Sequence, residues 1–168
     1  MLTRLADGTP IYVRPIRPDD KALLVGGLAR MSAASRQKRF LGPKHRFTVD
    51  ELRYLTEVDG IDHVAYVALR GDAPRELVAV GRLVRSTEDP TAAEIAVAVG
   101  DCWQRRGVGT LLGDLLATAA RDRDIRWLTA TMAADNAAAH RLFDHVSTRL
   151  RYERDGAVDE LWADLAAA

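Results

Sequence analysis

The chain has 168 residues, the length of one domain with a substantial core, so residues 1–168 are expected to form a single domain. Its 24 basic and 24 acidic side chains cancel, so no overall field favours binding to nucleic acid or to an anionic membrane. A single cysteine, Cys102, excludes an intrachain disulfide and a thiolate metal cluster, and the histidine spacing indicates no metal site.

The first part of the chain predicts one strand and three helical segments. Ile11–Val13 is a short strand, and Pro18-Asp19-Asp20 begins a helix, with proline in its first turn and acids at the positive end of its dipole. A short helical or irregular segment follows at Ser35–Leu41. Its basic residues Arg36 to Arg39 favour a solvated charged face. The capping-box spacing of Thr48 and Glu51 begins a third helix.

The period then changes to that of strands. His63–Leu69 and Leu77–Val84 are expected to pair as a hairpin, and Glu94–Val99 is the next strand. An amphipathic helix is predicted over Val108–Arg123, because leucines recur on one of its faces.

The last part of the chain predicts a strand, a helix and a hairpin. Arg126–Met132 is the strand, Asp135-Asn136 caps the helix, and Leu150–Arg154 with Val158–Leu165 forms the hairpin. The whole order predicts an α+β (mixed α/β) fold, with a central twisted mixed sheet of about seven strands and helices on both faces. The N-terminus has no apolar run typical of a signal peptide, and no segment reaches membrane-spanning length, so a cytoplasmic protein is expected.

The segment Gln104–Thr110, which reads Gln-Arg-Arg-Gly-Val-Gly-Thr, carries the strongest functional signal. Two glycines at the start of a helix let the backbone bend closely around a guest and leave several N–H groups unsatisfied. Those donors lie at the positive end of the helix dipole, which suits a phosphate or pyrophosphate. An ordinary strand-to-helix turn that needs small residues is the alternative interpretation.

With the order of elements, this segment resembles the GNAT (Gcn5-related N-acetyltransferase) superfamily, whose motif Gln/Arg-x-x-Gly-x-Gly/Ala fits Gln104 to Gly109 at every defined place. The resemblance implies the GNAT fold, with a cleft where the fourth and fifth strands splay apart. It also implies that acetyl-CoA is the acyl donor. The positions that the resemblance assigns to coenzyme A binding are Val97, Ala98 and Val99 for the pantetheine arm, Gln104, Arg105, Arg106, Gly107, Val108, Gly109 and Thr110 for the pyrophosphate, and Asn136 near the thioester.

A narrower similarity is to the Pat-type bacterial protein lysine acetyltransferase domain. The segments that carry it are Arg14–Asp20, Ser35-Arg36-x-x-Arg39-Phe40, Leu55–Asp59 and Ala93–Gln104. Such domains are often fused to a cyclic-nucleotide-binding domain. Because the acetyltransferase fold accounts for all 168 residues, regulation by a cyclic nucleotide is not expected.

Acetyl transfer to an amine requires a neutral nucleophile, and lysine has a reference pKa of about 10.4, so a base must remove a proton. The Pat-type resemblance assigns that role to Glu94, whereas a solvent-facing strand-edge glutamate is the alternative. Glu57 and Asp59 are weaker candidates. Many GNAT enzymes carry a tyrosine as general acid where this chain has Phe143, and His140 is a weak substitute for it.

The expected function is transfer of the acetyl group of acetyl-CoA to a primary amine, with a protein lysine as the leading acceptor. A small-molecule amine, such as an antibiotic, polyamine or amino acid, remains an alternative, and Asp155, Asp159 and Glu160 are the acids that the last hairpin could contribute to its binding. A third hypothesis is a non-catalytic acyl-CoA sensor or interaction module. A monomer or a homodimer is expected.

Overall fold

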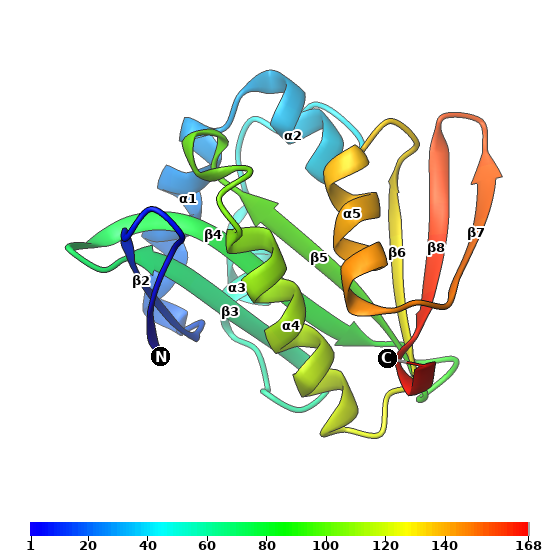
Figure 1. Ribbon diagram of the computed structural model, residues 1–168. Helices are drawn as coiled ribbons and strands as arrows, with labels where there is room; N and C mark the ends of the chain where they lie inside the picture. Colours follow the sequence, from blue (N-terminus) through cyan, green and yellow to red (C-terminus); the bar gives the residue numbers. More distant parts are fainter. Residues whose placement is uncertain (168) are drawn as a thin grey trace.

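An eight-stranded sheet forms the centre of the computed structural model, which describes residues 1–167 (Figure 1). The strand order is β1-β2-β3-β4-β5-β6-β8-β7, and within the described residues only β5 and β6 pair in parallel. The strands are β1 (Leu2–Arg4), β2 (Pro10–Pro15), β3 (His63–Arg70), β4 (Ala73–Arg85), β5 (Ala92–Val99), β6 (Trp127–Ala133), β7 (Leu150–Asp155) and β8 (Val158–Asp164).

The sheet therefore has one strand more than the seven that the sequence predicted. Leu2–Arg4 pairs with β2 as an N-terminal hairpin, in which Leu2 lies opposite Tyr12. Three residues are too few to show a period of two, so their pairing was not recognisable from the sequence. The mixed sheet, the helices on both faces and the final hairpin are confirmed.

Five α-helices cover the sheet, with α4 and α5 on one face and α1, α2 and α3 on the other (Figure 1). The capping box of Thr48 and Glu51 is formed at the start of α3, as predicted. The segment Ser35–Leu41, predicted as helical or irregular, belongs to helix α2, apart from its last residue. The helices are α1 (Lys21–Arg30), α2 (Ala33–Phe40), α3 (Val49–Thr56), α4 (Val108–Arg121) and α5 (Ala137–Val146), with short 3-10 turns at Pro18–Asp20, Asp101–Trp103 and Leu165–Ala167.

Helix α4 packs closely on both the sheet and α5 because a glycine lies at each of these two contacts. Leu112 and Leu116 are fully buried, and a Cβ at Gly81 of β4 would lie only 3.2 Å from Leu116 Cδ1. A Cβ at Gly113 of α4 would lie 2.4 Å from Leu142 Cδ1 of α5. These glycines allow α4, whose N-terminus is the predicted pyrophosphate loop, to be held tightly against the sheet.

Strands β5 and β6 separate after a short paired segment. Their pairing covers Ala92, Ala93 and Glu94, and the last pair is Glu94 with Thr129. From there to Val99 only the β4 side of β5 is paired. The predicted splay of the fourth and fifth strands is thus present between β5 and β6, shifted by one number because of the additional strand.

Within residues 1–167, no helix combines the length and the apolar character needed to cross a membrane. In the same part of the chain, no group of three or more His, Cys, Asp or Glu side chains is arranged to hold a metal ion.

Candidate active site

The glycine loop leaves the first turn of α4 open to an anion. Gly107 is the N-cap residue, with a φ of +87° that favours glycine, and no side chain caps the helix. The first N–H groups of a helix have no partner within it, so Val108, Gly109 and Thr110 present donors at the positive end of the dipole. This is the geometry that a pyrophosphate requires.

Gly109 distinguishes a binding loop from an ordinary turn. A Cβ at this position would meet only Val99 Cγ2, at 3.7 Å, which is an ordinary contact. Glycine inside a helix is unfavourable by roughly 0.5–1 kcal/mol relative to alanine, and here neither backbone conformation nor packing requires it. The missing side chain is explained by a guest that approaches the backbone, so the loop fits coenzyme A.

The side chains of Gln104 and Arg106, two residues of the predicted pyrophosphate loop, fix the loop to its surroundings, and coenzyme A binding by these positions stays a prediction. Gln104 Nε2 donates to Ser35 Oγ of α2 at 3.2 Å and to the Val99 carbonyl at 3.3 Å. Arg106 donates to Asp7 and to Thr9 Oγ1 in the N-terminal hairpin, and its guanidinium lies 4.5 Å from the centre of the Trp103 ring. The backbone of both residues remains in the loop. The sequence did not indicate the contacts with Ser35, Asp7 and Thr9, because these partners lie far away along the chain.

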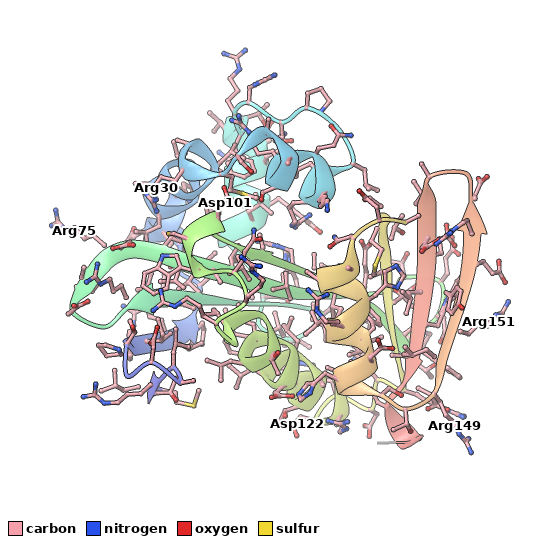
Figure 2. All side chains as sticks on the ribbon, turned by 45° about the horizontal axis from the view of Figure 1, so that its top comes forward. Arg30, Arg75, Asp101, Asp122, Arg149 and Arg151 are labelled. Atoms are coloured by element: carbon pink, nitrogen blue, oxygen red, sulfur yellow. The ribbon has the colours of Figure 1, made fainter. Side chains whose placement is uncertain are left out.

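Asp101 connects the same region to the opposite face of the sheet. Its carboxylate accepts hydrogen bonds from the Ser32 N–H at 2.6 Å and from the Ser35 hydroxyl (Figure 2). These hydrogen bonds lower the pKa of Asp101 in spite of partial burial, which acts in the other direction. The carboxylate therefore holds the start of α2 against the end of β5.

Past the splay, β5 presents unpaired main-chain groups. Gly100 N donates to Val78 O on β4, and antiparallel partners alternate between hydrogen-bonded and non-hydrogen-bonded pairs. The N–H and C=O of Ala98 consequently belong to the β4 ladder, whereas those of Val97 and Val99 point away from β4, and of these the Val99 carbonyl accepts the hydrogen bond from Gln104 Nε2. Of the three residues predicted to bind pantetheine, these two present polar groups to the cleft.

Asn136 lies across the cleft, at the end of β6. It is the N-cap of α5, and its Oδ1 accepts from the Ala139 N–H at 3.2 Å. This contact uses the carbonyl oxygen of the amide and leaves the Nδ2 group directed elsewhere. The capping prediction is confirmed, and the proximity to a thioester stays a prediction.

Glu94 lies at the vertex of the splay, because it is the last residue of β5 that pairs with β6. Its side chain is exposed and lines a hollow of about 160 Å³ with Thr129 and Thr131 of β6 and Glu160 and Trp162 of β8. Since side chains alternate along a strand, Glu94 shares its face with the residues under α1 and α2. The strand is internal to the sheet, but the side chain is exposed, as the solvent-facing alternative also expects, so the role of Glu94 as base stays a prediction.

The competing acid–base candidates are engaged elsewhere. Glu57 pairs with Lys21 at 2.8 Å, which lowers its pKa, and Asp59 accepts from the Ile61 and His63 N–H groups, which lowers its pKa as well. A carboxylate held in this way is a poorer base.

The candidates for a general acid are engaged as well. Phe143 is buried in the core and has no proton to give. His140 lies 3.1 Å from the buried carboxylate of Asp159 on β8, which also receives two hydrogen bonds from Arg154. His140 thus connects α5 to the last hairpin.

The arginine cluster near Glu94, which consists of Arg39 and Arg82, was not predicted from the sequence. The run of basic residues from Arg36 to Arg39 was interpreted as a solvated face. Arg39 is in fact half-buried, and burial lowers its pKa while the charge of Glu94 acts in the opposite sense. Arg82 on β4 is 6 % exposed, contacts His63 Nε2 at 2.8 Å and donates to the Leu55 carbonyl at 3.2 Å. Burial and the nearby charge of Arg39 lower the pKa of Arg82 to about 10, so it remains a cation at neutral pH.

A glycine loop at a helix N-terminus, a splayed strand pair and a carboxylate at the vertex of the splay define an acyl-coenzyme A transferase site. A sequence model of the Acetyltransferase (GNAT) family matches residues 32–146. The chain therefore belongs to the GNAT family, whose members are acyl-CoA-dependent N-acetyltransferases with acetyl-CoA as donor.

Two acetyltransferases are similar to this chain over most of its length. The chain is 32% identical over 139 residues to Acetyltransferase Pat of Mycolicibacterium smegmatis, covering 83% of this chain and 41% of that protein. It is 30% identical over 135 residues to Acetyltransferase PA5475 of Pseudomonas aeruginosa, covering 80% of this chain and 72% of that protein. The chain thus spans less than half of the length of the Pat relative.

Solved structures of acetyltransferases and acyltransferases have the same fold as this chain. The crystal structure of the GNAT domain of S. lividans PAT has a TM-score of 0.86 at 30% identity, covering 98% of this chain and 96% of that one. The cAMP-binding acyltransferase from Mycobacterium smegmatis has a TM-score of 0.66 at 28% identity, covering 98% of this chain and 46% of that one. The resemblance to Pat-type domains is confirmed.

Proposed function

We propose that this protein transfers the acetyl group of acetyl-CoA to the side-chain amine of a protein lysine, by direct attack with Glu94 as general base. The observation that carries the proposal is the position of Glu94 at the vertex of the β5–β6 splay, directly beyond the unpaired edge of β5. A pantetheine arm that follows the edge from the glycine loop brings its thioester toward this carboxylate.

Two of the three chemical tasks are assigned to groups near the splay. Glu94 accepts the proton of the ammonium, because attack requires the neutral amine. The N–H of Val97 faces the open edge and suits the oxygen that gains charge as the amine adds to the thioester carbon. The side chain of Phe143 cannot protonate the departing thiolate, and a coenzyme A thiolate is stable enough to leave without an acid.

The surroundings of Glu94 support a lysine on a protein surface. The hollow that Glu94 lines contains a second carboxylate, Glu160, and two threonines, and it opens on the side of β6 and β8 that faces away from α4 and α5. An ammonium group is attracted to paired carboxylates, and an exposed hollow admits a side chain carried by a large partner. The resemblance of the sequence to Pat-type protein lysine acetyltransferase domains implies the same acceptor class.

The test compares wild-type protein with Glu94→Gln. Calorimetry with acetyl-CoA should give the same dissociation constant for both, whereas thiol release with lysine-containing proteins should fall by about 10²–10⁴-fold in kcat for the variant. Glu88→Gln, in the exposed turn before β5, is the matched control and should keep full activity. Undiminished turnover by Glu94→Gln would exclude it as base. Tight binding without turnover of any amine would favour the sensor hypothesis.

A further inference from the structure

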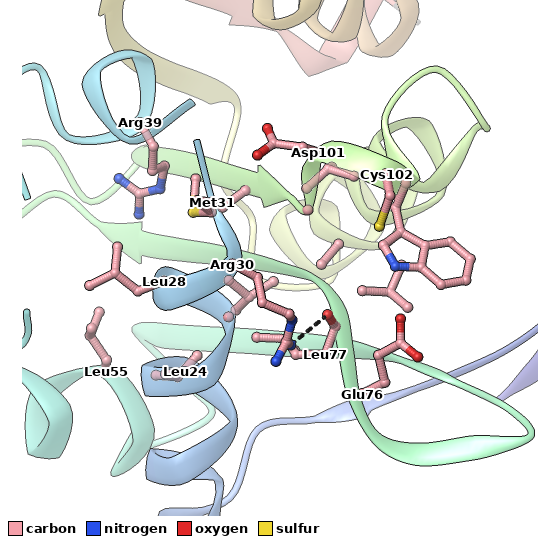
Figure 3. Close-up of a pocket in the computed structure, with 18 of the residues that line it drawn as sticks. Leu24, Leu28, Arg30, Met31, Arg39, Leu55, Glu76, Leu77, Asp101 and Cys102 are labelled. Carbon is pink, nitrogen blue, oxygen red and sulfur yellow. Dashed lines mark hydrogen bonds between the residues drawn. The ribbon is translucent and has the colours of Figure 1, made fainter. Parts of the chain in front are cut away.

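A cavity of about 400 Å³ lies on the acceptor side of the sheet, and the proposed reaction with protein lysine does not use it. Its floor is formed by β4 and the end of β5, and α1 and α2 cover it (Figure 3). Most of its lining is apolar, including Leu24, Leu28, Met31, Phe47 and Val80. This volume is typical of a small-molecule site, and it is far larger than the hollow beside Glu94.

The charged groups of the cavity are separated between its two ends. Arg39 lies at the end where Leu28 and Leu55 are found, whereas Asp101, Cys102 and Glu76 lie at the other end (Figure 3). Arg82 joins Arg39 at the first end, because its guanidinium donates to the Leu55 carbonyl. On the sheet, Arg82 lies opposite Ala96, one step along the same face from Glu94, so the cationic end adjoins the proposed base.

Among residues 1–167, neither guanidinium forms an ion pair with a carboxylate, although the charge of Glu94 acts on Arg39 over a longer distance. Within residues 1–167, Arg39 donates no hydrogen bond and has no carboxylate within 4 Å, and its guanidinium lies 5.0 Å from the centre of the Phe40 ring. Arg82 uses its donors on a neutral histidine ring and a carbonyl. Two like charges in a partly desolvated space are unfavourable together, and a carboxylate that received hydrogen bonds from both would relieve this.

We propose that the cavity binds a free amino acid with an apolar side chain as a second class of acceptor, whose carboxylate is held by Arg39 and Arg82. The apolar lining takes the side chain, and the α-amine, which is attached one carbon from the carboxylate, is directed toward Glu94. This inference rests on the proposed function, since it uses the same donor and the same base.

The reaction is the same acyl transfer with another amine. Glu94 takes a proton from the α-ammonium, and the nitrogen forms a bond to the acyl carbon. The carbon–sulfur bond then breaks, and its electron pair leaves with the coenzyme A thiolate. The second proton of the amine passes to solvent or to the thiolate, so the products are the N-acetyl amino acid and coenzyme A.

The test uses pairs of acceptors that differ in charge alone. Leucine and phenylalanine are compared with leucinamide and phenylalaninamide, and the product is identified by mass spectrometry beside thiol release. We expect kcat/KM to be at least about tenfold higher for each acid than for its amide, mainly through KM, since a charged hydrogen-bonding pair is lost with the carboxylate. It should rise from alanine to leucine by about fourfold for each buried methylene.

Arg39→Gln should bring the ratio of kcat/KM for leucine to kcat/KM for leucinamide close to one. Arg36→Gln, one turn earlier on α2 and outside the cavity lining, is the matched control and should keep the ratio. Binding is measured separately, by calorimetry of leucine against protein loaded with coenzyme A, and it should depend on Arg39 in the same way.

The outcomes separate the two proposals. Turnover of lysine-containing proteins without binding or turnover of any amino acid overturns this inference and leaves the proposed function standing. Equal rates for leucine and leucinamide overturn it too. If no amine of any kind is acetylated, the proposed function fails. Carboxylate-dependent binding of leucine then still supports the cavity as a site, and its absence rejects the cavity as well.

Discussion

At Gly109 the requirements of folding and of binding oppose each other. Gly109→Ala should leave stability unchanged or raise it by about 0.5 kcal/mol, because alanine favours the helix and its Cβ has space beside Val99. Affinity for acetyl-CoA should fall at least about tenfold, since the Cβ occupies the space of the pyrophosphate. Thermal denaturation and calorimetry measure the two quantities.

The control is Gly113→Ala in the same helix, where the new Cβ would lie 2.4 Å from Leu142 Cδ1. This variant should lose stability and keep its affinity, which is the reverse pattern. An unchanged dissociation constant for Gly109→Ala would show that the loop does not hold the pyrophosphate as inferred.

His63 makes stability depend on pH. Partial burial and the charge of Arg82 lower its pKa below the ordinary value of 6.5, and Asp59 opposes this only in part. The neutral ring is the form that accepts from Arg82. The stabilisation is therefore complete above pH 6.5 and is lost as the pH falls through the lowered pKa.

The measurement is chemical denaturation of wild-type protein and His63→Gln between pH 7.5 and pH 5. The wild-type protein should lose more of its free energy of unfolding toward the acid end than the variant does. Parallel curves for the two proteins would mean that His63 does not titrate differently in the folded and unfolded states.

At the scale of elements, the start of α3 supports the arginine cluster. Thr48 caps the helix, and the C-terminal part of α3 supplies the Leu55 carbonyl that receives a hydrogen bond from Arg82. Thr48→Ala should cost about 1 kcal/mol, which lowers Tm by about 2–4 °C in a domain of this size. Thr118→Ala, an exposed threonine within α4, is the control and should be nearly neutral.

At the scale of the whole molecule, the donor should stabilise the fold, because its proposed site joins β5, the glycine loop and the end of β6. Acetyl-CoA at about one hundred times its dissociation constant should add about 2.7 kcal/mol to the free energy of unfolding and raise Tm by about 5–10 °C. Thermal shift assays measure this. Adenosine 3′,5′-bisphosphate, which lacks the pantetheine arm, should give a smaller shift at equal concentration, and equal shifts would argue against binding along β5.

The sequence by itself determined the parts of this protein that depend on neighbours in the chain. The capping box at Thr48, the N-cap at Asn136, the glycine loop and the order of strands and helices are set by local spacing and periodicity, and these sufficed for the fold class and the donor. The strand at Leu2–Arg4 was missed because it is defined by its partner.

Only the tertiary structure decided what surrounds the proposed base, Glu94. Arg39 on α2, Arg82 on β4 and Glu94 on β5 are far apart in the chain, and they meet because α2 packs over the β4–β5 face. The tertiary structure also directs Arg106 to the N-terminal hairpin and leaves Glu94 at the vertex where β5 and β6 separate. The physical reason is that burial, charge pairing and cavity shape arise from contacts between distant segments, which no local pattern encodes.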